Sequence, residues 1–473
     1  MKIVKNLFYN ASYQILLVLL PLITVPYVSR VLGPEGIGIN SYTNSIASFF
    51  MILGSLGIDK YGTRQIAYLA GEKKNISSTF TEIVLLKFVT IGTVILCYLI
   101  YCFSVTNFRQ YLLVQSLLIF AAAIDVSWFF MGIEDFKKTV LRNTLVKLIS
   151  ALLVFIFVRK YDGIQIYILI LTGSIFMGNL TLWPYAKKYF HPCRKSLKNL
   201  KKHLLPSLHF FVPQLSVSLY LLLNKTMVTW LVSVEAAGFF DNSDKVIRVL
   251  LAIATASGTV MLPRVANTFA SGNIEKVNNY VTQFFDLVSL ISIPIMFGLI
   301  AIIPSYANII FGSDFNGISN IIILMAPSIW FISLGNVFGM QYLVATNQLK
   351  YYTIALIGGE ILNLILNIIF LPKYGVNAAG INMSISELTI VLIQMHFVWK
   401  QVNFSVAFKN IGKYILSSSL MFISVKILDS IQNVSLMSLI TQIFVGITTF
   451  VISIIVVKPT SLSLIKDVVS KRR

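Results

Sequence analysis

Stretches of about 20 apolar residues recur along the whole chain, and they restrict its fold more than any other feature. A helix needs about 20 such residues to cross the hydrocarbon core of a membrane. Fourteen stretches have this character: 11–32, 38–58, 80–101, 110–131, 140–158, 165–185, 208–232, 244–263, 284–304, 318–344, 351–371, 376–398, 414–428 and 437–457. The connections are short, so the sequence predicts an all-α, polytopic membrane protein of about 14 transmembrane helices without a soluble domain.

The composition agrees with this fold class and excludes several others. Of the 473 residues, 56% are hydrophobic and 12% are charged, whereas soluble proteins carry about 25% charged residues. Disorder, collagen and a disulfide-rich secreted scaffold are excluded by the same figures. The three cysteines and four histidines lack the spacing of a metal site. We therefore expect no metal and no resident cofactor.

The net charge of +20 follows the predicted sides of the membrane. With the N-terminus inside, 27 of the 38 Lys and Arg residues fall in cytoplasmic segments and seven fall outside. By the positive-inside rule, both termini are expected in the cytoplasm. The basic composition is therefore explained by topology, and we expect no nucleic-acid partner.

An internal repeat of about 200 residues divides the chain. The segment 28–38 matches 228–238, which pairs Glu35 with Glu235 and Gly38 with Gly238. Six helices separate equivalent elements, so the repeat is parallel, as in alternating-access transporters. The predicted domains are listed in chain order: a six-helix bundle over 1–190, a basic cytoplasmic linker over 186–207, a second bundle over 208–400, two further helices over 410–460 and a basic tail over 461–473.

Four cations remain inside predicted helices: Lys87, Lys147, Lys225 and Arg248. Lys225 has no acid three or four residues away, so we expect it to face a cavity. Arg248 follows Asp244 by four residues, and an ion pair between them is the alternative. Lys87 and Lys147 lie near predicted cytoplasmic ends, where their ammonium groups can snorkel.

Polar side chains share faces with these cations. Gln214 and Ser218 lie on the face of Lys225, and Thr255 lies on the face of Arg248. Asn40 and Asn44 form a similar stripe on the second predicted helix. We expect a hydrated cavity between the two halves, although such stripes also serve as helix–helix contacts.

Other residues complete the predicted site. Arg30 lies at the end of the first predicted helix, beside Glu35. It can either bind a ligand or have a structural role at the helix end. The substrate-binding cations of the cavity are predicted to be Arg30, Lys225 and Arg248.

Candidates for proton or Na⁺ coupling are Asp125, Glu360 and Glu387, with structural ion pairing as the alternative. Pro21 and Pro26 are predicted to bend or unwind the first helix as a hinge.

The sequence argues against an enzyme. It contains no G-x-x-x-x-G-K-[ST] loop for ATP, and no predicted outer loop is long enough for a catalytic domain. A membrane glycosyltransferase or polymerase and a gated channel stay as alternatives from other functional classes.

Several segments resemble Wzx-type polysaccharide flippases. They are 27–38 (YVSRVLGPEGIG), 128–134 (WFFMGIE), 223–227 (LNKTM) and 238–242 (GFFDN). The family usually has Asp before the lysine of the third segment, whereas this chain has Asn224 before Lys225. The resemblance covers the whole chain.

The resemblance implies membership of the MOP exporter superfamily, whose two six-helix bundles form a MATE-like V shape, often with two extra helices. It implies that undecaprenyl-diphosphate-linked oligosaccharide repeat units are moved from the inner to the outer leaflet of the bacterial cytoplasmic membrane. The polymer would be capsule, O-antigen or another exported polysaccharide, with polymerase and chain-length machinery as partners. A lipid II flippase is the main rival. A multidrug or ion antiporter fits less well, because cationic drugs call for acids in the cavity.

Overall fold

A computed structural model describes residues 2–69, 73–191, 199–256, 258–402 and 404–459. All regular secondary structure in these ranges is helical, which confirms the predicted all-α class. The chain forms two compact units, residues 1–238 (the N-terminal unit) and 239–473 (the C-terminal unit). The division falls inside one helix, after Gly238. The bundle boundaries that the repeat predicts stay a prediction.

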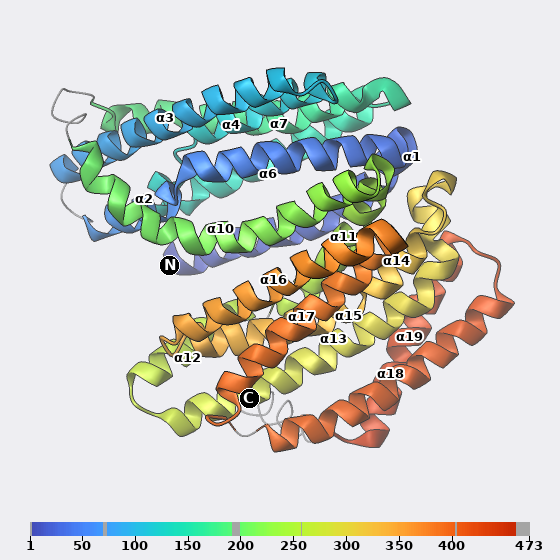
Figure 1. The fold of residues 1–473 in the computed structure, drawn as a ribbon. Coiled ribbons are helices and arrows are strands. Elements are labelled where there is room, and N and C mark those ends of the chain that lie inside the picture. The colour runs from blue at the N-terminus through green and yellow to red at the C-terminus, as the bar shows by residue number, and fades with distance from the viewer. Residues whose placement is uncertain (1, 70–72, 192–198, 257, 403, 460–473) are drawn as a thin grey trace. The chain divides into compact units, whose positions relative to one another are not determined.

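Helices of the N-terminal unit pack into one bundle. They are α1 (Lys2–Ser55), α2 (Ile58–Tyr68), α3 (Lys73–Ser104), α4 (Arg109–Ala123), α5 (Ser127–Gly132), α6 (Phe136–Phe157), α7 (Ile164–Leu180), α8 (Trp183–Ala186), α10 (Leu200–Leu231) and the start of α11 (Val234–Thr255), with 3-10 turns η1 (Tyr161–Gly163) and η2 (Lys187–Tyr189). Helices α3, α4 and α7 lie side by side, and α1 packs against α3, α4, α6 and α10 (Figure 1).

Helix α1 contains two of the predicted membrane helices. Its backbone leaves helical geometry at Gly33, where φ is 63°, and Pro34 follows. Glycine tolerates a positive φ that a side chain would strain, so Gly33 separates the two predicted segments. Pro21 and Pro26 lie within regular helix, and no unwinding occurs there. Their role as a hinge stays a prediction.

Helices of the C-terminal unit form a second bundle. They are the rest of α11, α12 (Gly258–Ala270), α13 (Ile274–Phe311), α14 (Ile318–Met325), α15 (Pro327–Gly335), the π-helix η4 (Asn336–Val344), α16 (Leu349–Tyr374), α17 (Val376–Val398), α18 (Ser405–Ile431) and α19 (Leu436–Val457), with the 3-10 turn η3 (Ser313–Phe315). Helix α13 packs against α18, α18 against α19, and α16 against α17 (Figure 1).

Ten described segments are long and apolar enough to cross a membrane. They correspond to ten of the fourteen predicted runs. The other four runs lie on α1, on α10 and on α11 with α12. The polytopic membrane fold is therefore confirmed, whereas the count of fourteen stays a prediction. The predicted linker is partly helical, because α10 begins at Leu200; its residues 192–198 and the predicted tail 461–473 lie outside the described ranges.

An ion pair between a buried lysine and an aspartate that is 42% exposed joins α2 to α3. The Lys87 side chain is 1% exposed, and its Nζ lies 2.6 Å from Oδ1 of Asp59. The same ammonium donates to the carbonyl oxygen of Asp125 at 3.0 Å. Nearby, Trp128 packs on Gly62, where an added Cβ would lie 2.5 Å from the indole ring. The ammonium and the indole thus hold α2, α3 and α5 together.

We predict that Asp59→Ala destabilises the N-terminal unit by about 3 kcal/mol, because it leaves the buried Lys87 charge without its carboxylate. The double variant Asp59→Ala/Lys87→Met should recover most of this loss, since it removes the charge as well. Thermal unfolding of the detergent-solubilised protein measures both effects. Asp135→Ala is the control, because its partner Lys138 is 35% exposed whereas Lys87 is buried; this pair should contribute less than about 1 kcal/mol. Equal melting temperatures for Asp59→Ala and the double variant would contradict the prediction.

Candidate functional site

A lysine lies in the middle of helix α6, in the N-terminal unit. Lys147 is eleven residues after the first residue of α6, about 16 Å along the helix axis. Lys147 is exposed, and no carboxylate of the described residues forms an ion pair with its ammonium group. A charge at this depth of a membrane-spanning helix is costly unless it faces water or an anion. Lys147 is therefore a candidate for a functional position.

The side chain of Lys147 lines a polar pocket of about 140 Å³ between α1, α4, α6 and α7. The polar side chains around it are Asn40, Asn44, Gln115, Ser150, Thr172 and Ser174. A second pocket of about 120 Å³ shares Lys147 and Ser150 and includes Pro21, Thr24 and Tyr167. The lysine thus belongs to two adjoining pockets, both inside the N-terminal unit.

The amides of the larger pocket are only loosely bonded to each other. Gln115 Nε2 lies 3.4 Å from both Asn40 Oδ1 and Thr43 Oγ1, and Ser48 donates to Asn44 Oδ1 at 3.4 Å. Bonds of this length are weak. Gln115 Oε1 is buried and accepts no hydrogen bond from the described residues. Such an acceptor requires a donor, for which water or a sugar hydroxyl is suited.

The three predicted substrate-binding cations have different surroundings. Arg30 is exposed on α1, and the neighbouring Glu35 accepts a hydrogen bond from the Tyr161 hydroxyl. Lys225 is half-buried on α10. Arg248 lies on α11 in the C-terminal unit, where its Nε is 2.8 Å from Oδ2 of Asp244. The ion pair weighed as the alternative for Arg248 is therefore formed, and a binding role for the three cations stays a prediction.

The polar residues predicted to line the cavity also have different surroundings. Asn40 and Asn44 face the Lys147 pocket. The hydroxyl of Thr255 donates to the carbonyl oxygen of Leu251 in its own helix, and Ser218 is half-buried on α10. The side chain of Gln214 lies outside the described part of the structure. Asn40 and Asn44 are thus the predicted lining residues that the structure brings together with a cation.

The three acids predicted to couple transport to an ion also have different surroundings. Asp125 Oδ1 accepts a hydrogen bond from the backbone N–H of Ser127 at the start of α5, and its carbonyl accepts from Lys87. Glu360 and Glu387 lie on the packed helices α16 and α17 and interact electrostatically. Beside them, Asn382 donates to Asn367 at 2.9 Å, and Asn367 donates to Asn363 at 3.0 Å. Glu360 and Glu387 therefore lie in a polar part of the C-terminal unit.

The surroundings of Lys147 differ from those that its sequence position indicates. Its position suggested snorkelling to the cytoplasmic end, whereas the structure places it in a pocket with two of the predicted lining residues. Ser150 follows it by three residues and lines the same pocket. The spacing of Lys147 and Ser150 was a signal that could have identified this face, because residues three apart share one side of a helix.

The paired glycines of the internal repeat contact each other's helices within the N-terminal unit. A Cβ added to Gly38 would lie 1.8 Å from the carbonyl oxygen of Val234, and one added to Gly238 would lie 2.0 Å from that of Pro34. Both contacts are reciprocal and carry the same 200-residue offset as the repeat. Only glycine permits this backbone approach of α1 and α11.

Known proteins share both sequence and fold with this chain. It is 23% identical over 401 residues to a protein of Escherichia coli strain K12 assigned to O-antigen transport, a match covering 83% of this chain and 96% of that protein. Among solved structures, the lipid II flippase MurJ in an inward closed conformation superposes with a TM-score of 0.70 at 18% identity, covering 95% of this chain and 98% of the other.

An inward-facing multidrug resistance transporter of the MATE family in the MOP superfamily superposes with a TM-score of 0.66 at 15% identity, covering 85% of this chain and 99% of the other. The family described as polysaccharide biosynthesis protein matches residues 3–269, more than half of the 473 residues. The chain therefore belongs to the polysaccharide biosynthesis protein family and has the multi-pass membrane fold of MOP-superfamily transporters.

Proposed function

We propose that this protein moves undecaprenyl-diphosphate-linked oligosaccharide repeat units from the inner to the outer leaflet of the bacterial cytoplasmic membrane by alternating access. The observation that carries the proposal is the Lys147 pocket, where a cation and several amides meet at mid-helix inside a membrane bundle. The E. coli relative, assigned to O-antigen transport, supports an oligosaccharide substrate. Both termini are then cytoplasmic, as the positive-inside rule predicts.

The chemistry of the pocket suits the head of such a lipid. A diphosphate needs cations to leave water, and an ammonium donates charge-assisted hydrogen bonds to phosphate oxygens. Asn40, Asn44 and Gln115 provide amide donors and acceptors that match sugar hydroxyls. At about 140 Å³, the pocket holds part of the head group rather than a whole repeat unit. Arg30 and Lys225 are proposed to extend the cationic path.

Energy for transport is proposed to come from proton or Na⁺ binding. Glu360 and Glu387 are the leading candidates, because they lie on the packed helices α16 and α17, which also carry the hydrogen-bonded amides of Asn363, Asn367 and Asn382. Asp125 is a weaker candidate, since its side chain caps α5. Polymerase and chain-length machinery would receive the flipped repeat unit.

We predict that Lys147→Ala lowers the rate of flipping about tenfold or more, because a hydrogen bond to a charged group contributes about 1.5–3 kcal/mol. The assay measures movement of a fluorescent lipid-diphosphate-oligosaccharide in vesicles containing the purified protein. Lys147→Arg should retain most of the rate. Lys160→Ala, at an exposed position after α6, is the control for charge removal.

The same vesicles test the substrate. Faster movement of lipid II than of the oligosaccharide lipid would favour the rival flippase, and export of a cationic dye alone would favour an antiporter. Unchanged flipping in folded Lys147→Ala protein would remove the pocket from the mechanism.

We predict that Gly38→Val and Gly238→Val each slow flipping at least tenfold while the protein remains folded, because any side chain would overlap a backbone carbonyl and hold α1 and α11 apart. The proposed cycle requires this contact to form and open. Gly412→Val on α18 is the matched control, since no atom lies within 4 Å of its Cβ position. Melting temperatures check folding. Normal flipping by both folded variants would show that the contact plays no part in transport.

A further inference from the structure

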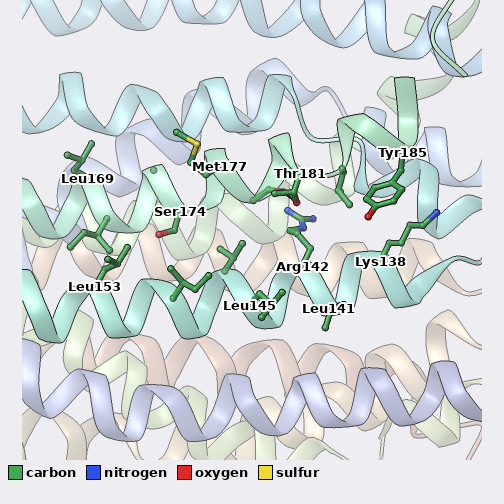
Figure 2. A pocket seen from close by; sticks show the side chains of 16 residues that line it. Lys138, Leu141, Arg142, Leu145, Leu153, Leu169, Ser174, Met177, Thr181 and Tyr185 are labelled. Atoms are coloured by element: carbon green, nitrogen blue, oxygen red, sulfur yellow. Dashed lines mark hydrogen bonds between the residues drawn. The ribbon is translucent and has the colours of Figure 1, made fainter. Parts of the chain in front are cut away.

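A long groove runs between α6 and α7 in the N-terminal unit (Figure 2). Its volume is about 590 Å³, and both of its walls belong to segments long and apolar enough to span a membrane. Most of the lining is aliphatic, and Leu141, Leu145, Ile149, Leu169 and Met177 are exposed along it. In a membrane, an apolar and accessible groove of this kind faces lipid chains.

Cationic and hydroxyl groups gather at one end of the groove (Figure 2). Lys138 Nζ lies 4.8 Å from the ring centroid of Tyr185, 5.2 Å from that of Phe130 and 2.8 Å from Oδ2 of Asp135. Arg142 donates to Oδ1 of Asn179. These contacts hold both cations at the end of the groove that lies near the start of α6.

The amide of Asn179 is itself fixed in position. The side chain is 3% exposed, and its Nδ2 donates to the carbonyl oxygen of Ala121 at 2.7 Å. The guanidinium of Arg142 is therefore held by a buried amide that α4 anchors. A guanidinium held in this way loses less conformational entropy when it binds a phosphate.

The depth of these cations matches a lipid head group. Lys138 and Arg142 are two and six residues after the first residue of α6, about 3 and 9 Å along the axis. This is the helix end that the sequence predicts to be cytoplasmic. Basic pockets between membrane helices on that side commonly bind anionic lipid head groups.

The net charge at the basic end of the groove indicates whether a phosphodiester or a diphosphate lipid fits there. Asp135 neutralises Lys138, so Lys138, Arg142 and Asp135 together carry one net positive charge. A phosphodiester carries one negative charge, whereas a polyprenyl diphosphate carries at least two. We propose that the α6–α7 groove binds an anionic glycerophospholipid, with its phosphodiester at Arg142 and Lys138 and one acyl chain along the aliphatic wall. This site is separate from the Lys147 pocket, although Val146 and Ser174 line both.

The test is native mass spectrometry of the full-length protein in neutral detergent, with phosphatidylglycerol or phosphatidylcholine added. We expect phosphatidylglycerol to be retained and to raise the melting temperature, and phosphatidylcholine to do neither. Arg142→Gln should weaken phosphatidylglycerol binding about tenfold or more, and Arg142→Lys should retain part of it. Arg264→Gln, an exposed cation of the C-terminal unit that stacks on Tyr280, is the control.

A second variant tests the acyl-chain part without touching a charge. No atom lies within 4 Å of the Cβ position of Gly173, which lines the groove, so Gly173→Phe fills the space without a backbone clash. We expect it to weaken phosphatidylglycerol binding, whereas Gly92→Phe on α3, which is equally open, should not.

The outcomes are independent of flipping, because binding and melting are measured without transport. Equal retention of both phospholipids, or wild-type binding by Arg142→Gln and Gly173→Phe, would overturn the proposal. Preferential retention of a polyprenyl phosphate over phosphatidylglycerol would overturn the assigned occupant.

Discussion

The cost of placing charge in hydrocarbon governs this structure. Each cation inside a predicted membrane helix must find a carboxylate, water or an anion, because the membrane core offers none. Lys87 has Asp59, and Arg248 has Asp244. Lys147 instead lines a pocket of amides and hydroxyls. Lys87 holds helices together, Lys147 is proposed to contribute to transport, and a binding role for Arg248 stays a prediction.

The two glycines that the predicted repeat pairs also make a close contact in the structure. The glycines that the repeat pairs, Gly38 and Gly238, approach each other's helices with equivalent backbone contacts. A backbone approach this close is specific, because every other residue type would prevent it. We propose that this contact forms and opens in each transport cycle.

Two kinds of anionic lipid are assigned to different surfaces of one bundle. The polar pocket at Lys147 lies deep in the helices, where a diphosphate needs replacement for its hydration. The α6–α7 groove carries its cations near the start of α6 and offers aliphatic wall along the rest. We propose that depth separates a transported lipid from a resident one.

Apolar run length and charge distribution were enough to predict an all-helical membrane protein from sequence, because hydrocarbon enforces both on any spanning chain. The motifs around Gly33 and Trp128 also indicated the family. Only the tertiary structure decided which groups surround each lysine inside the membrane helices. Lys87 and Lys147 look alike in sequence, yet Asp59 lies 28 residues before Lys87 and the amides of Asn40 and Gln115 come from two other helices. Pairing across helices depends on how the helices pack, and the spacing within one helix contains no record of it.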